Sequence, residues 1–335
     1  MHPAHDNLNL EGTPVVRLES DWLRAEVAPR VGGRVVSLVE KSGGHEFLWR
    51  NGAQALREHP TGTEYDPHFY GGIDELLPND IPEVIDGVPC PDHGELWTTP
   101  LSWGLENGRL KLQGSLLQFG LGYEREMALR PDAPWLDITY RITNPTAQPR
   151  HFLWKLHAAL SVHPGDIIDC PARKAQVVDL NWSRYPTLEP FAWPRIECQS
   201  ANIVPPADDT VDFFYLFDLT EGRIALRRPG EGLEFAYHFD SSVFRYAWIF
   251  ASYGGFNGHY TVVLEPCTAM PISVNEASAR KQCSVLQPGE TLETRVAIHA
   301  ARERPPGVPP RAGLPTIGRA QLHPLSGPDS VLQQS

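Results

Sequence analysis

The sequence predicts an all-β protein, specifically a large antiparallel β-sandwich. Segments in which apolar and polar residues alternate recur along the chain, and between Thr13 and Ala301 there is no long amphipathic helical pattern. Glycine and proline are abundant, with 28 and 32 residues among 335, and they fall between the alternating segments. Short strands that recur roughly every 8–12 residues between turns favour a sandwich over an α/β fold.

The clearest predicted element is a hairpin near the middle of the chain. Residues 123–129 and 136–142 both alternate, the turn-forming segment 130–134 lies between them, and Asn144-Pro145 ends the second strand. The other predicted strands, in chain order, are residues 15–28, 34–40, 110–117, 150–154, 223–228, 247–252, 259–264 and 291–299.

A single domain is expected over residues 1–303. A chain of this length can bury a sizeable core without disulfides or structural metals. From Arg302 onward the composition changes, because the segment RERPPGVPPRAGLPTIG is rich in proline and glycine and has little apolar periodicity. Residues 304–335 are therefore predicted to form a tail that is disordered or lies along the surface, and docking of this tail on the sandwich stays open.

The charge balance disfavours two classes of partner. The chain has 29 basic and 41 acidic residues, a net charge of −12, which repels phosphate backbones and anionic membranes, so neither nucleic acid nor a membrane is expected. No signal peptide or membrane-length apolar stretch is visible, which predicts a cytoplasmic, soluble protein. Scattered cysteines without metal-ligand spacing predict free thiols in a reducing compartment, at Cys90, Cys170, Cys198, Cys267 and Cys283.

Four short segments carry residues that could perform chemistry. They are residues 155–160, residues 263–267 followed by Pro271 and Asn275, residues 91–97 and residues 70–78. Each alone also has a common structural explanation: a hydrogen-bonded core histidine, a glutamate at a strand end, or glycines in a turn. Their joint order along the chain is more informative than any one of them.

In that order the segments resemble the aldose 1-epimerase family of the galactose mutarotase-like superfamily. The resemblance covers about residues 13 to 300 and rests on a collinear set of motifs rather than on one of them. The matching motifs are Gly32-Gly33-Arg34, residues 71–78, His93-Gly94, Ile142-Thr143-Asn144, His157, Leu264-Glu265 with Pro271 and Asn275, and Leu286-Gln287-Pro288-Gly289-Glu290.

The resemblance implies a large antiparallel supersandwich that interconverts the α and β anomers of a free sugar. It implies that Glu265 is the general base and His157 the general acid, and that His93 and Asp212 bind the substrate. Opening a pyranose makes the same demand, because the anomeric hydroxyl must lose a proton while the ring oxygen gains one, which a carboxylate and an imidazolium can do near neutral pH. No metal, nucleotide or redox cofactor is expected.

Sugar binding also favours flat apolar surfaces and carboxylates that accept hydrogen bonds from hydroxyl groups. Trp97, which lies beside the His93-Gly94 motif, is a candidate platform for the sugar ring. Asp74, Glu75 and Glu95 are candidate hydroxyl acceptors, and the competing interpretation is that they lie on solvated loops.

Several residues depart from the family pattern and leave the substrate open. Ala158-Ala159 replace the usual aromatic pair after the acid, and Pro266-Cys267-Thr268 follow the base. Residues 70–77 contain no arginine, which disfavours a phosphorylated sugar. The alternatives are another carbohydrate-active enzyme on the same fold, such as an isomerase, lyase or two-carboxylate hydrolase, or a non-catalytic carbohydrate-binding protein. A monomer and a homodimer are both compatible with the sequence.

Overall fold

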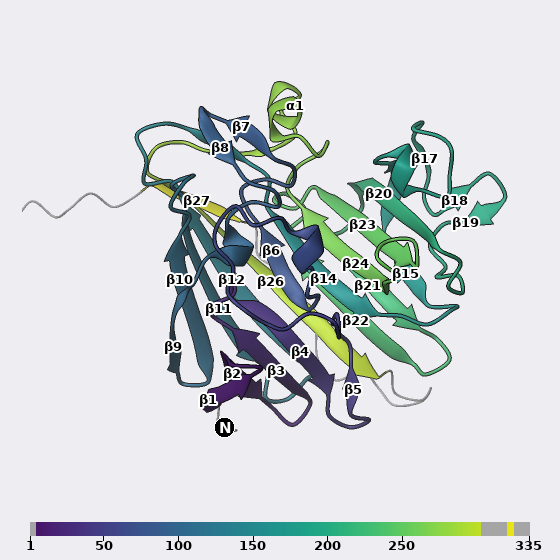
Figure 1. Cartoon of the computed structure of the whole chain (residues 1–335), viewed down its shortest axis with the longest axis horizontal. Coiled ribbons are helices and arrows are strands. Elements are labelled where there is room, and N and C mark those ends of the chain that lie inside the picture. Colours follow the sequence, from purple (N-terminus) through teal and green to yellow (C-terminus); the bar gives the residue numbers. More distant parts are fainter. Residues whose placement is uncertain (1–4, 303–319, 325–335) are drawn as a thin grey trace, which may run out of the picture.

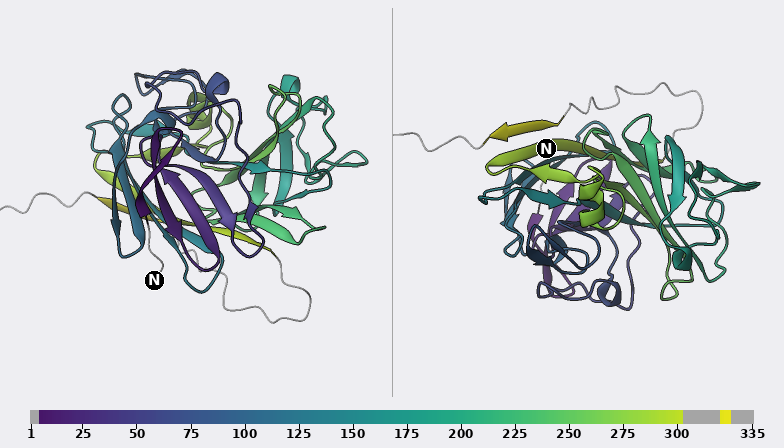
Figure 2. Two further views of the ribbon diagram at one scale, coloured as in Figure 1. Left: turned by 60° about the horizontal axis from the view of Figure 1, so that its bottom comes forward. Right: turned by 90° about the horizontal axis from the view of Figure 1, so that it is seen from above.

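Two antiparallel sheets pack face to face and contain most of the chain (Figures 1 and 2). The computed structural model describes residues 5–302 and 320–324. The first sheet runs, in spatial order, through β1 (His5–Leu10), β2 (Thr13–Glu19), β3 (Leu23–Ala28), β4 (Arg34–Glu40), β6 (Ile73–Leu76), β14 (Lys155–Ser161), β24 (Tyr260–Cys267), β23 (Tyr246–Tyr253), β20 (Thr210–Leu219), β16 (Ala172–Val177) and β17 (Phe191–Ala192), with β5 (His45–Glu46) paired to β4.

The second sheet is built around one long strand, β26 (Glu290–Arg302), which crosses Figure 1 diagonally in yellow-green. Its spatial order is β15 (Ile167–Asp169), β21 (Arg223–Arg228), β22 (Leu233–Phe239), β26, β12 (Trp135–Thr143), β11 (Gly122–Leu129), β10 (Arg109–Ser115) and β9 (Ser102–Glu106). Strand pairings within both sheets are antiparallel throughout the described residues. The prediction of a large antiparallel β-sandwich is therefore confirmed.

The remaining elements are short and lie outside the two sheets. Three two-stranded pairs are formed by β7 (Glu83–Ile85) with β8 (Val88–Cys90), β13 (Arg150–Phe152) with β25 (Ser284–Leu286), and β18 (Arg195–Ile196) with β19 (Gln199–Ser200). The helical turns are η1 (Asp66–His68), η2 (Leu96–Thr98), η3 (Leu180–Trp182) and α1 (Val274–Ala279). None of the helices in the described part of the chain is long and apolar enough to cross a membrane.

The predicted hairpin is present as β11 and β12, which pair from Gly122–Thr143 to Leu129–Leu136. Its alternation has the expected cause, since Leu136, Ile138, Tyr140 and Ile142 are all buried in the core between the sheets.

The predicted strand over residues 15–28 is instead two strands, β2 and β3. The side chain of Ser20 accepts hydrogen bonds from the backbone N–H groups of Trp22 and Leu23, which fixes a tight turn between them. A serine that caps its own turn in this way interrupts a strand without any proline or glycine.

Strand β14 shows how the fold positions side chains on two different faces. Leu156, Ala158 and Leu160 point into the core between the sheets, where they join the same cluster as residues of the second sheet. Because successive strand residues alternate, Lys155 and His157 point to the opposite face. That face is buried as well, because the segment between β5 and β9 covers it.

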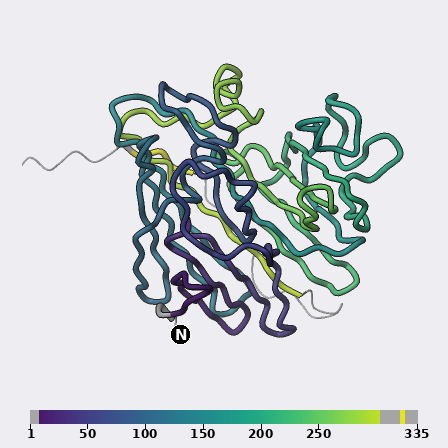
Figure 3. Tube along the Cα trace, in the orientation of Figure 1, coloured from purple at the N-terminus to yellow at the C-terminus, as the bar shows by residue number. Residues whose placement is uncertain are grey.

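Helix α1 and the β7–β8 hairpin lie at the same end of the molecule (Figure 3). The carboxylate of Glu83 accepts hydrogen bonds from the Ser273 hydroxyl and from the backbone N–H groups of Val274 and Asn275. Unpaired N–H groups at a helix start need such an acceptor, so this contact fixes the hairpin to the helix.

Part of the predicted tail is described by the structure. Residues Gln321–Pro324 form β27, which pairs antiparallel with residues 290–293 of β26 (Figure 2). The other residues of the predicted 304–335 tail lie outside the described ranges, so the domain boundary at residue 303 stays a prediction.

Candidate active site

A cavity of about 250 Å³ opens on the face of the first sheet that is turned away from the second sheet. Its charged lining comes from β14, β24 and the segment between β5 and β9. This lining includes the two residues expected to act as acid and base and the expected binding histidine. Its charged and titratable members are Asp66, Asp80, Asp92, His93, Lys155, His157 and Glu265.

His157 is held in one orientation by groups behind it. Its Nδ1 atom lies 2.8 Å from Oδ1 of Asp74, and Oδ2 of Asp74 in turn contacts the Arg34 guanidinium at 2.7 Å. The Tyr65 hydroxyl donates to the same Asp74 oxygen at 2.7 Å. Burial alone would raise the pKa of Asp74, but the positive charges of Arg34 and His157 outweigh it and lower that pKa to about 2. The ionised carboxylate therefore holds Nδ1, and Nε2 of His157 faces the cavity.

Glu265 lies beside His157 on the neighbouring strand β24 and is paired with a buried lysine. Nζ of Lys155 contacts Oε2 of Glu265 at 2.8 Å and Oδ2 of Asp80 at 2.5 Å. From the described residues Oε2 accepts no hydrogen bond of suitable angle, so its contact with Lys155 is an ion pair. Burial alone would lower the pKa of Lys155, but the charges of Asp80 and Glu265 raise it above its ordinary value. Lys155 is therefore a fixed cation between two carboxylates.

His93 and Lys155 both lie near Asp80, His93 on the side of Oδ1 and Lys155 on the side of Oδ2. The Nδ1 atom of His93 is 2.8 Å from Oδ1 of Asp92, its Nε2 atom is 3.8 Å from Oδ1 of Asp80, and its ring stacks on Tyr65 at 4.2 Å between centroids. Burial alone would lower the pKa of His93, but the hydrogen bond to Asp92 and the charge of Asp80 raise it above its ordinary value. The raised pKa favours the cationic form of His93.

The gap between His157 and Glu265 defines the chemistry that the site can perform. Nε2 of His157 is 3.8 Å from Oε1 of Glu265, which is too long for a direct hydrogen bond. A proton donor and a proton acceptor separated in this way can each reach one of two oxygens on the same carbon atom. The hemiacetal carbon of a cyclic sugar carries such a pair of oxygens.

The three predicted carboxylates do not line the cavity. Asp74 lies behind His157, as described above. Glu75 points into the core between the sheets, where it accepts hydrogen bonds from Arg125 at 2.7 Å, Tyr123 at 2.9 Å and Trp154 at 3.0 Å. Successive residues of β6 face opposite sides of the sheet, so Asp74 and Glu75 cannot both face a sugar.

The other predicted carboxylate, Glu95, binds backbone N–H groups and does not face the cavity. Its two oxygens accept hydrogen bonds from the backbone N–H groups of Gln118 and Phe119 at 2.9 and 2.7 Å. The competing interpretation of a solvated loop does not hold for Glu95, which is only 2% exposed.

Trp97 and Asp212 likewise lie outside the cavity lining. Trp97 is 1% exposed and packs edge-to-face against Tyr65 at 5.1 Å, so it supports the site from behind and presents no free ring face. Asp212 is fully buried and forms an ion pair with Arg184, whose Nη2 atom lies 2.5 Å from Oδ2. Its carboxylate is thus engaged by a guanidinium in this structure.

Several cavity residues were not among the predicted site residues. Lys155 could have been found by strand periodicity, because it lies two residues before His157 and shares its face. Asp80 and Tyr65 carry no comparable local signal, since each reaches the site from a loop. The aromatic part of the lining comes from distant segments as well, at Trp182, Phe213, Phe250 and Phe256.

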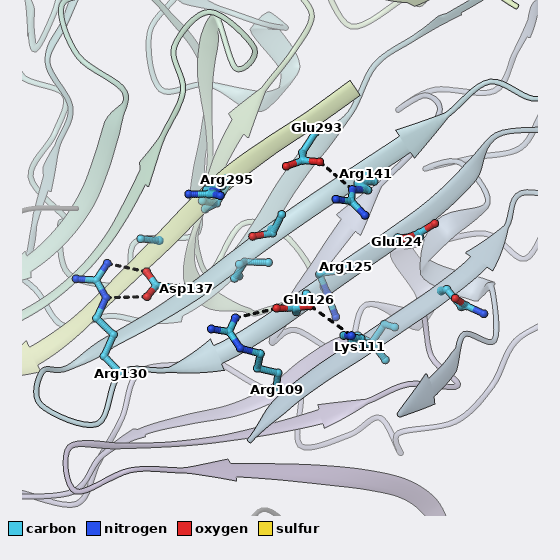
Figure 4. A pocket seen from close by; sticks show the side chains of 16 residues that line it. Arg109, Lys111, Glu124, Arg125, Glu126, Arg130, Asp137, Arg141, Glu293 and Arg295 are labelled. Carbon is cyan, nitrogen blue, oxygen red and sulfur yellow. Dashed lines mark hydrogen bonds and ion pairs between the residues drawn. The ribbon is translucent and has the colours of Figure 1, made fainter. Parts of the chain in front are cut away.

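A larger hollow of about 600 Å³ lies on the outer face of the second sheet, over β10, β11, β12 and β26 (Figure 4). Its charged side chains pair with one another across the strands. Ion pairs join Arg130 to Asp137, Arg109 to Glu126 and Arg141 to Glu293. Such ladders of exposed pairs are typical of a solvated sheet face. The candidate site is therefore the smaller cavity, where the charges are buried.

Comparisons with known proteins agree with this architecture. Residues 10–75 match a family described as a domain of unknown function, DUF5107. The Slr1438 protein of Synechocystis sp. PCC 6803 superposes with a TM-score of 0.68 at 18% identity, over 90% of this chain and 100% of its own. A candidate aldose 1-epimerase from Klebsiella pneumoniae has a TM-score of 0.68 at 12% identity, over 86% and 79%. A galactose mutarotase-like protein from Clostridium acetobutylicum has a TM-score of 0.65 at 15% identity, over 90% and 99%. At such identities the likeness establishes the fold, and the chain has the galactose mutarotase-like sandwich fold.

Proposed function

We propose that the protein is an aldose 1-epimerase that interconverts the α and β anomers of a free, non-phosphorylated sugar. The observation that carries the proposal is the facing pair of Nε2 of His157 and Oε1 of Glu265, 3.8 Å apart at the wall of the cavity. The fold similarity to galactose mutarotase-like proteins supports the same assignment.

In the proposed reaction, Oε1 of Glu265 takes the proton of the anomeric hydroxyl while Nε2–H of His157 gives a proton to the ring oxygen. The bond between C1 and the ring oxygen breaks, and C1 becomes an aldehyde carbon. Rotation about the C1–C2 bond presents the other face of the aldehyde. The ring then closes with both proton transfers reversed, so each residue returns to its starting state.

The surrounding residues support these roles. The carboxylate of Asp74 accepts a hydrogen bond from Nδ1 of His157 and directs its Nε2 atom to the cavity. Lys155 orients Glu265 through Oε2 and leaves Oε1 for the substrate. The cavity also carries the carboxylates of Asp66 and Asp92, which disfavour an anionic sugar phosphate.

Glycoside hydrolysis with Asp80 as the acid finds less support in the same geometry. It needs a second carboxylic acid that stays protonated until it donates. Asp80 is the carboxylate that shares Lys155 with Glu265, and burial alone would raise its pKa. The charge of Lys155 instead holds the pKa of Asp80 below its ordinary value, so it is a poor proton donor.

The test is anomer interconversion of free aldoses, followed by polarimetry or anomeric NMR. We expect the protein to accelerate it, and Glu265→Gln to reduce the rate by about 100-fold or more, since the amide cannot accept the proton. Glu276→Gln, which changes an exposed glutamate on α1, is the matched control and keeps full activity. A folded Glu265→Gln protein with undiminished activity would contradict the assignment of the base.

A further inference from the structure

The two sides of the cavity differ in chemistry. In the order of the first sheet, β14 and β24 supply Lys155, His157 and Glu265, whereas the next strands, β23 and β20, supply Phe250 and Phe213. A molecule that reaches the charged side therefore also meets an aromatic wall.

This wall begins directly beside the proposed acid. Ala159 lies two residues beyond His157 on the same face of β14, and its cross-strand neighbour is Val263. Val263 is paired with Phe250, and Phe250 with Phe213. The four side chains thus form an apolar row across four strands, one step along the sheet from the catalytic pair.

Two residues outside the sheet extend the row into a continuous surface of rings. Phe256 packs edge-to-face on Phe250 at 5.4 Å, and Trp182 lies 5.7 Å from Phe256 and 6.1 Å from Phe250. Phe213 packs on Phe250 at 5.7 Å. These four rings are all partly exposed, and all of them line the cavity.

A hydroxyl group placed against this wall would find little to bond. The only polar side-chain atom in these residues is the indole Nε1 of Trp182, and the rest is hydrocarbon. A hydroxyl that loses water without gaining a partner is unfavourable, whereas a methyl group in the same place gains from burial.

The proposed mechanism places the C5 side of the sugar ring beside His157. His157 gives its proton to the ring oxygen, which in a pyranose is bonded to C1 and to C5. The exocyclic carbon C6 is attached to C5. Along β14 from His157, one direction leads to Lys155 and Asp80, which are charged, and the other leads to the apolar row. The exocyclic C6 group fits the apolar direction when it is a methyl group.

We propose that the substrate is a 6-deoxyhexose, an inference that rests on the proposed epimerase function. The C6 methyl group packs against Val263, Phe250 and Phe213, while the hydroxyl groups of the ring face the charged side. A hydrophobic pocket discriminates against one added hydroxyl by roughly 10- to 100-fold, and this is the expected ratio of kcat/KM between a 6-deoxyhexose and its parent hexose.

The experiment compares matched pairs of sugars with the unmodified protein, using anomeric NMR exchange rates. Suitable pairs are L-fucose with L-galactose, L-rhamnose with L-mannose, and 6-deoxy-D-glucose with D-glucose. A higher kcat/KM for the deoxy member of at least one pair supports the inference. Equal or better use of the parent hexoses overturns it and leaves the epimerase function standing. Acceleration of no sugar at all overturns both.

A variant tests whether the wall causes the preference. Phe213→Tyr adds a hydroxyl group to the wall, and we expect it to narrow the deoxy preference severalfold, chiefly by raising kcat/KM for the parent hexose. Phe217→Tyr is the matched control, because it lies on the same strand and outside the cavity lining. An unchanged preference in a folded Phe213→Tyr protein would contradict the role of the wall.

Discussion

Lys155 sets the charge balance between two carboxylates that lie at the centre of the site. Its Nζ atom contacts both Asp80 and Glu265, and its side chain is only 3% exposed. Removing a buried cation leaves the two acids facing each other, and two adjacent carboxylates cannot both stay ionised at low cost. Lys155 is therefore the residue that allows Glu265 to act as a base beside Asp80.

We predict that Lys155→Met moves the acidic limb of the pH–activity profile to higher pH by about 1–3 units, because the carboxylate pair now retains a proton. The measurement is the rate of anomer interconversion between pH 4 and 9. Lys174→Met, which removes an exposed lysine paired with Asp218, serves as the matched control and keeps the parent profile. A parent-like profile in a folded Lys155→Met protein would show that Lys155 does not tune the base.

At the residue scale the sequence could predict which chemistry-bearing residues meet, and less well what each one contacts. His157, Glu265 and His93 were predicted together, and the structure brings all three to one cavity. Glu75 and Trp97 were predicted beside them and lie elsewhere. Proximity to a motif says nothing about which face of a strand a residue occupies, and one step along the chain reverses that face.

At the scale of elements, the loop that carries His93 is fixed by backbone contacts to the strand end beside it. The N–H group of His93 donates to the carbonyl of Asp80 at 2.6 Å, and that of Glu95 donates to the carbonyl of Leu77 at 2.9 Å. Gly94 lies between these contacts with a φ of +72°. A Cβ atom at Gly94 would lie 2.4 Å from the carbonyl oxygen of Leu77, so only glycine allows the approach.

We predict that Gly94→Ala destabilises the protein by about 1–3 kcal/mol more than Gly87→Ala, and also raises KM because His93 is displaced. Gly87 is a matched control, since its φ is +80° and an added Cβ would meet nothing within 4 Å. Urea unfolding and sugar titration measure the two effects. Equal stability losses in the two variants would mean that the backbone conformation, and not the close approach, decides the requirement for glycine.

Elements were predictable where alternation was strong and the turns were made by proline or glycine. The β11–β12 hairpin satisfies both conditions. The junction of β2 and β3 was missed because Ser20 makes that turn through its side chain. β22 is absent from the predicted strands although Leu233, Phe235, Tyr237 and Phe239 alternate and are buried, so that signal was available in the sequence.

At the scale of the whole molecule, a buried ion pair connects the two sheets. Glu75 belongs to β6 of the first sheet and Arg125 to β11 of the second, and both side chains are only 1% exposed. Arg125 also donates to the carbonyl of Gly33. Pairing between sheets cannot be read from the sequence, because it depends on which strands become opposite after folding.

Removing one partner of a buried ion pair lowers the free energy of unfolding more than replacing both partners with apolar residues does. Glu75→Leu leaves Arg125 as an unpaired buried cation, and we expect a loss of about 3–5 kcal/mol in the free energy of unfolding. The double variant Glu75→Leu with Arg125→Met removes both charges, so we expect it to recover more than half of that loss, as buried ion pairs replaced by apolar residues often do. Urea unfolding of the single and double variants gives the coupling.

A surface pair provides the comparison for this prediction. Arg109→Met breaks the contact with Glu126 on the outer face of the second sheet, where Arg109 is 59% exposed, and should cost less than about 1 kcal/mol. If Glu75→Leu were as mild as Arg109→Met, Glu75 would not be needed to compensate the buried charge of Arg125. If the double variant were as unstable as the single one, the loss would come from Tyr123 and Trp154, which also donate to Glu75. The expected pattern, a severe single and a milder double variant, would show that Glu75 compensates the buried charge of Arg125 across the two sheets.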